Sequence, residues 1–320
     1  MSLAEFFADH TFRTVFLGTV IIGVVAGALG CFSYLRKQSL IGDVVSHAAL
    51  PGVLGAFLLG SALAGAGVPG INPRNMLWLV VGAVVTGSLA AWLANWAAAH
   101  SKLRIDATMA VSLTLFFGVG MMLMRTISNG NYPGKGGVQD YLFGNASTLT
   151  VSDVWTAAAL GGAALAVLTL GWRHFAVRSF DPGHAAVSGA PVRLIDAVMF
   201  AAIVLATVLG VKSVGLVLMV ALLLTPAAAA RQWTRRLGPM VWLAAVIGGV
   251  GAGLGAYLSI ALGTVPTGPV TVLVLFAVFL VSILVAPGRS VLAVARAQRA
   301  TRRRLLKELV RTQTEEAGAK

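Results

Sequence analysis

The sequence predicts an all-α protein that crosses a membrane many times. Of its 320 residues, 58% are hydrophobic and only 11% are charged, and the mean hydropathy is +0.86. Apolar runs recur along the chain, and a helix needs about 20 such residues to cross the hydrocarbon core of a bilayer. This composition excludes an ordinary soluble domain.

Runs of about 20 apolar residues give the expected spans in order along the chain. They lie near residues 14–35, 41–60, 75–99, 106–127, 153–173, 194–211, 213–230, 240–262 and 268–286. This reading gives nine transmembrane helices. The number falls to eight if 194–211 and 213–230 form one broken unit, or if the segment that starts at Gly42 is re-entrant.

The flanking segments differ from the membrane domain, which we place at residues 14–290. Residues 1–13 carry acidic side chains, unlike the start of a secretory signal peptide, and are expected to be an N-terminal segment at the membrane interface. Residues 291–320 form a basic tail that suits a cytoplasmic helix against anionic headgroups or a soluble partner, or a solvated tail. The single cysteine, Cys31, lies in the first span and is interpreted as a buried thiol.

The distribution of positive charge predicts the orientation. Lys and Arg are retained in short cytoplasmic loops, and most of the 24 Lys and Arg residues fall in segments that a cytoplasmic C-terminus places inside. Nine spans then put the N-terminus outside. The net charge of +13 needs no nucleic-acid partner, because the positive residues belong to inner loops and the tail.

Two ionisable residues, Asp43 and His47, stand at the start of the second span. Their i, i+4 spacing places them on one helix face, and ionisable groups inside a span are functional candidates. Asp oxygen and His nitrogen suit Mn²⁺, Fe²⁺ or Zn²⁺. Two ligands are too few for a tight site, but two subunits meeting on a two-fold axis supply four. The alternative is a hydrogen-bonded pair at the cytoplasmic end of the span.

Two later spans carry packing signals. Gly249 and Gly253, and separately Gly251 and Gly255, are spaced four residues apart, which allows close approach of helix backbones. Pro226 lies near the end of another span and favours a kink there.

Four stretches of the chain resemble, in order, the permease subunits of bacterial ATP-binding-cassette importers for manganese, zinc and iron. They are "RKQSLIGDVVSHAALPGV", "SFDPGHAAVSGAPVRLID", "SVGLVLMVALLLTPAAAARQWT" and "VPTGPVTVLVLFAVFLVSILVAPGR". The resemblance covers roughly residues 14–290. It implies a type II importer-like fold in the bacterial cytoplasmic membrane and assigns Asp43 and His47 to coordination of the transported metal. The chain departs from the family's usual pattern at Gly183, where an acidic residue commonly follows Asp-Pro.

The same resemblance implies that ATP is used by a separate partner chain. The nearest approach to a phosphate-binding loop, "GNYPGKGG", has three rather than four residues after its first glycine and lacks the Ser or Thr that binds Mg²⁺. The chain is therefore expected to be a transport subunit and not an enzyme, with no permanently bound cofactor. Its expected partners are an ATPase dimer, a second permease, identical or paralogous, an extracytoplasmic metal-binding protein and membrane lipid.

The coupling segment is expected at residues 178–193. "FDPGHAAVSG" can form a short helix with Asp181 as its N-cap and Pro182 in its first turn. The residues expected to contact the ATPase are Asp181, Pro182, Gly183, His184 and Gly189.

Two other classes of protein are weighed against this interpretation. A secondary transporter could use Asp43 and His47 as a proton relay and would need no ATPase. An intramembrane metalloprotease needs a clustered metal site such as His-Glu-x-x-His, and this motif does not occur in the sequence.

Overall fold

The computed structural model describes residues 10–36, 39–67, 72–73, 75–132, 149–188, 191–263 and 265–286. Every regular element in these ranges is a helix, which confirms the predicted fold class. In chain order they are α2 (His10–Leu35), α3 (Ser39–Gly65), α4 (Met76–His100), α5 (Ile105–Asn129), α7 (Val151–Leu170), α8 (Trp172–Phe180), α9 (Pro182–Val187), α10 (Val192–Val214), α11 (Leu216–Trp233), α12 (Leu237–Leu262) and α13 (Thr267–Val285).

Among the described residues, eight helices are long and apolar enough to cross a membrane: α2, α3, α4, α5, α7, α10, α12 and α13. The sequence predicts nine, and the ninth, at 213–230, corresponds to α11. The eight do not include α11, an apolar helix of 18 residues some of whose side chains lie outside the described set. The segment from Gly42 does not turn back, because α3 is a continuous helix of 27 residues.

The apolar stretch that the sequence left as one unit or two is divided between α10 and α11. The two helices meet at Gly215, whose φ of 91° is a backbone conformation that residues with a Cβ rarely adopt. Pro226 lies inside α11, which continues beyond it to Trp233.

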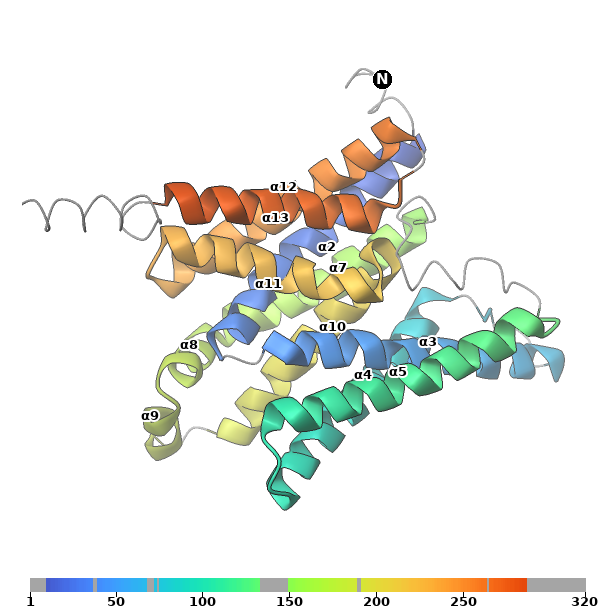
Figure 1. Ribbon diagram of the computed structural model, residues 1–320, viewed down its shortest axis with the longest axis horizontal. Coiled ribbons are helices and arrows are strands. Elements are labelled where there is room, and N and C mark those ends of the chain that lie inside the picture. The colour runs from blue at the N-terminus through green and yellow to red at the C-terminus, as the bar shows by residue number, and fades with distance from the viewer. Residues whose placement is uncertain are drawn as a thin grey trace, which may run out of the picture.

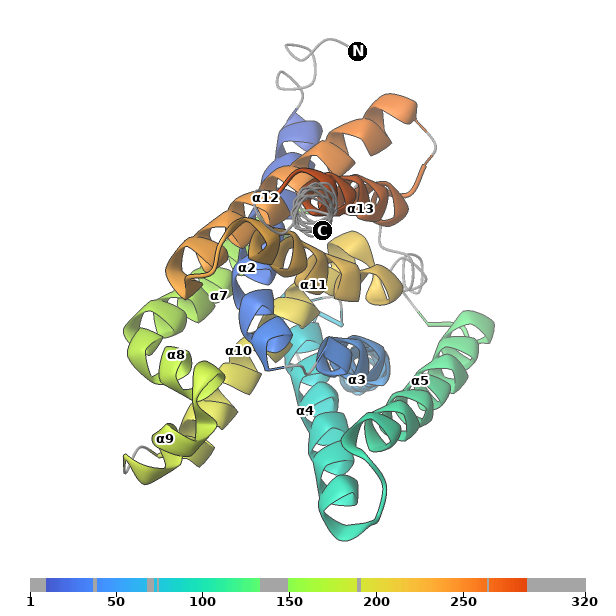
Figure 2. The same cartoon turned by 60° about the vertical axis from the view of Figure 1, so that its left-hand side comes forward.

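The helices form two groups around α10 (Figures 1 and 2). In one group, α2 packs against α7, α11 and α12, and α13 lies against α11 and α12. In the other, α3, α4 and α5 pack on one another. Contacts of α10 with α2 on one side and with α3 and α4 on the other join the groups.

Small residues let α12 sit closely between two neighbours. Gly249 and Gly253 face Val20, Val24 and Phe16 of α2, whereas Gly251 and Gly255 face Leu275 and Thr271 of α13. The close approach that the glycine spacing predicted is therefore confirmed, and each glycine pair serves a different neighbour.

On α2 itself, two glycines meet the backbone of α12. A Cβ on Gly27 would run into the carbonyl of Ala244, and one on Gly23 would run into the carbonyl of Gly248. The two helix backbones are thus in direct contact along this seam.

Two boundaries differ from the sequence prediction. Helix α2 begins at His10, so residues 10–13 are helical and continuous with the first span, while the rest of the predicted N-terminal segment lies outside the described residues. The fifth span ends at Leu170, and the chain continues as α8, a helix that the sequence analysis did not predict. Three basic residues in nine keep the hydropathy of α8 low, while one face of the helix buries Phe175.

Basic side chains gather at one end of the molecule. Both views place α8 and α9 at the same end as the junction between α11 and α12 (Figures 1 and 2). Arg173 and Arg178 belong to α8, and Arg231, Arg235 and Arg236 lie at that junction. This grouping is what a single cytoplasmic face requires.

Candidate functional site

Asp43 and His47 lie in the second and third turns of α3 and share one of its faces, as their spacing predicted. The Nδ1 atom of His47 is 3.0 Å from Oδ1 of Asp43. The side chains are 14% exposed for His47 and 30% exposed for Asp43, so both remain reachable from outside the protein interior. The structure brings the two candidate ligands together without any other helix intervening.

The hydrogen bonds of His47 determine which nitrogen can bind a metal. Nδ1 also lies 3.0 Å from the backbone carbonyl of Asp43. Both the carbonyl and the carboxylate are acceptors, so Nδ1 carries the hydrogen and Nε2 keeps its lone pair in the neutral ring. A carboxylate that holds a histidine in this way fixes the orientation of the ring and increases its strength as a metal ligand.

The surroundings of the pair hold α3 in place. Val45 on the opposite face and Val44 on the flank are buried, and Thr86 of α4 donates a 2.6 Å hydrogen bond to the carbonyl of Ala48. Phe117 of α5 meets the His47 ring edge to face, with ring centroids 5.1 Å apart. Packing on three sides leaves the Asp43 and His47 face as the accessible one.

Among the described residues, one chain supplies only this pair as candidate metal ligands. In the part of the chain that the structure describes, no group of three or more His, Cys, Asp and Glu side chains could hold a metal ion. A donor set of one carboxylate and one imidazole fits a borderline divalent cation that is bound briefly and released.

The predicted coupling segment contains the expected short helix. Asp181 caps α9 by accepting a 2.9 Å hydrogen bond from the backbone N–H of His184, and Pro182 occupies the first turn. Gly183 and His184 are exposed. Gly189, which was predicted to belong to the same contact surface, lies outside the described residues, as does the side chain of Pro182.

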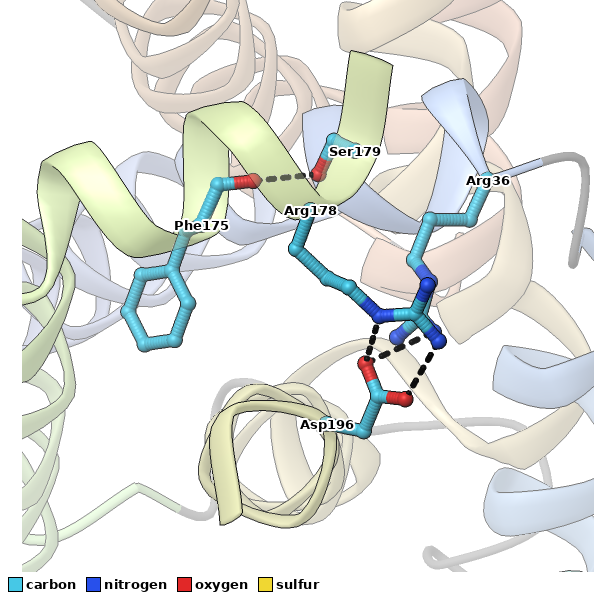
Figure 3. Close-up of polar contacts among 5 residues, drawn as sticks. All are labelled: Arg36, Phe175, Arg178, Ser179 and Asp196. Carbon is cyan, nitrogen blue, oxygen red and sulfur yellow. Dashed lines mark hydrogen bonds and ion pairs between the residues drawn. The ribbon is translucent and has the colours of Figure 1, made fainter. Parts of the chain in front are cut away.

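Three charged residues to which the sequence analysis gave no role as a site meet beside α8 (Figure 3). They are Arg36 at the end of α2, Arg178 on α8 and Asp196 on α10. The two arginines are unremarkable in the sequence, because arginines near span ends are expected of cytoplasmic loops. Only Asp196 could have been identified from the sequence as a candidate functional residue, because it is a carboxylate in the first turns of a span.

A cysteine introduced at Gly183 is expected to react with a membrane-impermeant maleimide only from the cytoplasmic side. The site is exposed, and an added Cβ there meets only the Asp181 side chain at 3.5 Å. The native Cys31 is buried and should stay unlabelled. Labelling in intact cells without permeabilisation would reverse the predicted orientation.

The model of the ABC 3 transport family matches residues 8–286 of the chain. Over 291 residues the chain is 36% identical to the zinc transport system membrane protein TroC of Treponema pallidum, covering 91% of this chain and 94% of TroC. It is 35% identical over 296 residues to the manganese transport system membrane protein MntC of Bacillus subtilis, covering 92% of this chain and 66% of that protein.

A solved structure agrees with these relatives. The chain superimposes on PsaBC from Streptococcus pneumoniae, solved in complex with Fab, with a TM-score of 0.79 and 29% sequence identity, covering 90% of this chain and 98% of the other. Sequence and fold thus agree over almost the whole helical region. The chain belongs to the ABC 3 transport family.

Proposed function

We propose that this chain is the permease subunit of an ATP-driven importer for a divalent transition metal, Mn²⁺, Zn²⁺ or Fe²⁺. The observation that carries the proposal is the Asp43–His47 pair at the start of a membrane-spanning helix in a member of this family. Relatives named for zinc and for manganese transport support the class of substrate.

The metal passes through a site made by two permease subunits, identical or paralogous. One chain offers the Nε2 lone pair of His47, and the Asp43 carboxylate becomes the second ligand when the His47 ring turns away from it, so that each chain supplies half of a four-coordinate set. The face of α3 that bears the pair is partly exposed, and Leu40 on the same face is 38% exposed. A second subunit against this face completes the ligand set and shields it from water and lipid.

ATP is hydrolysed by a separate cytoplasmic ATPase dimer that docks on α9. Support comes from the exposed, capped helix at the basic end of the molecule and from the family to which the chain belongs. An extracytoplasmic binding protein delivers the metal to the other side of the bacterial cytoplasmic membrane. Closure and opening of the ATPase dimer alternate access to the site between the two sides.

The test is metal uptake by proteoliposomes that contain this chain with its co-purified partners. We expect uptake of Mn²⁺ or Zn²⁺ that requires ATP on the ATPase side and stops with a non-hydrolysable analogue. A protonophore should leave the rate unchanged. Uptake that proceeds without ATP and collapses with the protonophore would instead establish the proton-relay transporter, for which the relatives offer no support.

A further inference from the structure

The carboxylate of Asp196 is held by two guanidinium groups from two other helices (Figure 3). Arg178 binds it with two parallel hydrogen bonds, Nε to Oδ1 at 2.9 Å and Nη2 to Oδ2 at 2.7 Å. Arg36 adds a third bond, from Nη2 to Oδ1 at 2.9 Å. A bidentate arginine pair fixes both distance and orientation, unlike a flexible contact between point charges.

This cluster is more than a solvated surface pair. The side chains of Arg36 and Arg178 are 17% and 18% exposed, and that of Asp196 is 30% exposed. Hydrogen bonding to Asp196 raises the pKa of Arg178, and burial lowers that of Arg36, yet both guanidinium groups stay charged. Without the carboxylate, two cations would face each other in a partly buried space.

Two of the three residues lie next to segments that matter for transport. Arg178 lies in α8, which is separated from the ATPase-facing helix α9 only by Asp181. Arg36 closes the last turn of α2, where its N–H bonds to the carbonyl of Phe32. From Arg36 the chain enters α3 within three residues and reaches Asp43 four residues after Ser39. The cluster therefore joins the docking segment to the chain that leads into the metal pair.

A separate contact keeps α8 attached to α2. The ring of Phe32 meets Phe175 and Trp172 edge to face, with centroids 6.1 and 6.3 Å apart, and both Phe32 and Phe175 are buried. This apolar contact already anchors α8, so the charged cluster is not needed simply to hold the helix in place. Its directional bonds suit it to transmit a displacement.

We propose that Arg36, Asp196 and Arg178 form the mechanical link through which movement of α8 and α9 reaches the junction of α2 and α3. The idea rests on the proposed function, because an ATPase acting on α9 supplies the movement. When the ATPase pulls on α9, the paired side chains make α8, α10 and the end of α2 move as one body. Breaking the pairs releases α8 from α10 and leaves only the apolar contact with α2, so that less metal is transported for each ATP hydrolysed.

The experiment measures ATP hydrolysis and metal uptake in the same proteoliposomes of the full assembly. Asp196→Asn keeps the side-chain volume but removes the charge, and we expect the metal transported per ATP to fall roughly tenfold. Arg36→Gln should give a similar loss while leaving the bidentate pair of Arg178 and Asp196 intact, so it decides the question if Asp196→Asn folds poorly. Asp106→Asn is the matched control, because Asp106 pairs with Arg104 at 3.9 Å on the exposed surface.

Restoration by a reversed pair separates coupling from simple stability. Arg178→Glu combined with Asp196→Arg rebuilds an ion pair between α8 and α10 and leaves a carboxylate for Arg36, so it should recover much of the transport that each single change loses. Crosslinking of a cysteine at Gly183 to the ATPase should be unchanged in every variant. Parental metal-to-ATP ratios in both Asp196→Asn and Arg36→Gln would overturn the link. Absence of ATP-driven uptake by the unaltered assembly would instead refute the proposed function itself.

Discussion

Asp43→Asn should lower ATP-dependent metal uptake by roughly 10- to 100-fold, the range seen when a carboxylate that supports a metal-bound histidine is lost. Asn is nearly isosteric, and its amide oxygen can still accept the hydrogen bond from Nδ1 of His47. The helix should therefore keep its packing while the site loses its negative charge. His47→Ala should have at least as large an effect, because it removes the only nitrogen donor of the pair.

The control for these changes is Asp106→Asn on α5, which alters the same chemical group on an exposed carboxylate. Uptake is measured with radioactive Mn²⁺ or Zn²⁺, alongside the amount of chain in the membrane and its recovery with the ATPase. Unaltered protein should also lose uptake in acid, because protons compete with the metal for imidazole. If both substituted proteins transport at the parental rate, Asp43 and His47 are only a hydrogen-bonded pair near the end of a span.

Gly27→Val should prevent much of the chain from reaching its folded state. The new Cβ would fall on the carbonyl of Ala244, a backbone atom that cannot rotate away, so α2 and α12 must separate. Overpacking of a tight core costs about 1–3 kcal/mol, and more when backbone must move. The fraction of monodisperse protein in detergent and its thermal unfolding midpoint should both fall.

Gly162→Val on α7 provides the matched comparison, since nothing lies within 4 Å of a Cβ built there. It introduces the same side chain into a helix of the same membrane domain and should leave both measurements close to parental values. Equal behaviour of the two variants would mean that the seam between α2 and α12 is looser than the structure indicates.

Features encoded within a few residues could be predicted from the sequence. The face shared by Asp43 and His47, the N-cap formed by Asp181 and eight of the nine expected spans depend on local spacing and hydropathy, and the structure confirms each. The spacing of the two glycine pairs of α12 also predicted close helix packing. It could not identify the helix that each pair contacts.

Features that depend on residues far apart could not be predicted in this way. Arg36 and Asp196 are separated by 160 positions, and no local pattern indicates that they meet. Helix α8 was not predicted because its charged residues lower the mean hydropathy of the segment. Its apolar face can be recognised only from the contact with Phe32 of α2. The helix boundary at Gly215 could not be predicted, because the segments on its two sides are equally apolar and hydropathy does not separate them.

The seam between α2 and α12 also constrains how the protein is made. Sγ of Cys31 is 3.8 Å from the carbonyl of Met240, a contact between residues 209 positions apart. A ribosome that adds 5–20 residues per second needs about 10–40 s to supply the second half of that contact. During this interval the glycine face of α2 has no α12 to receive it. Lipid or an insertion chaperone must cover that face until α12 is released into the bilayer.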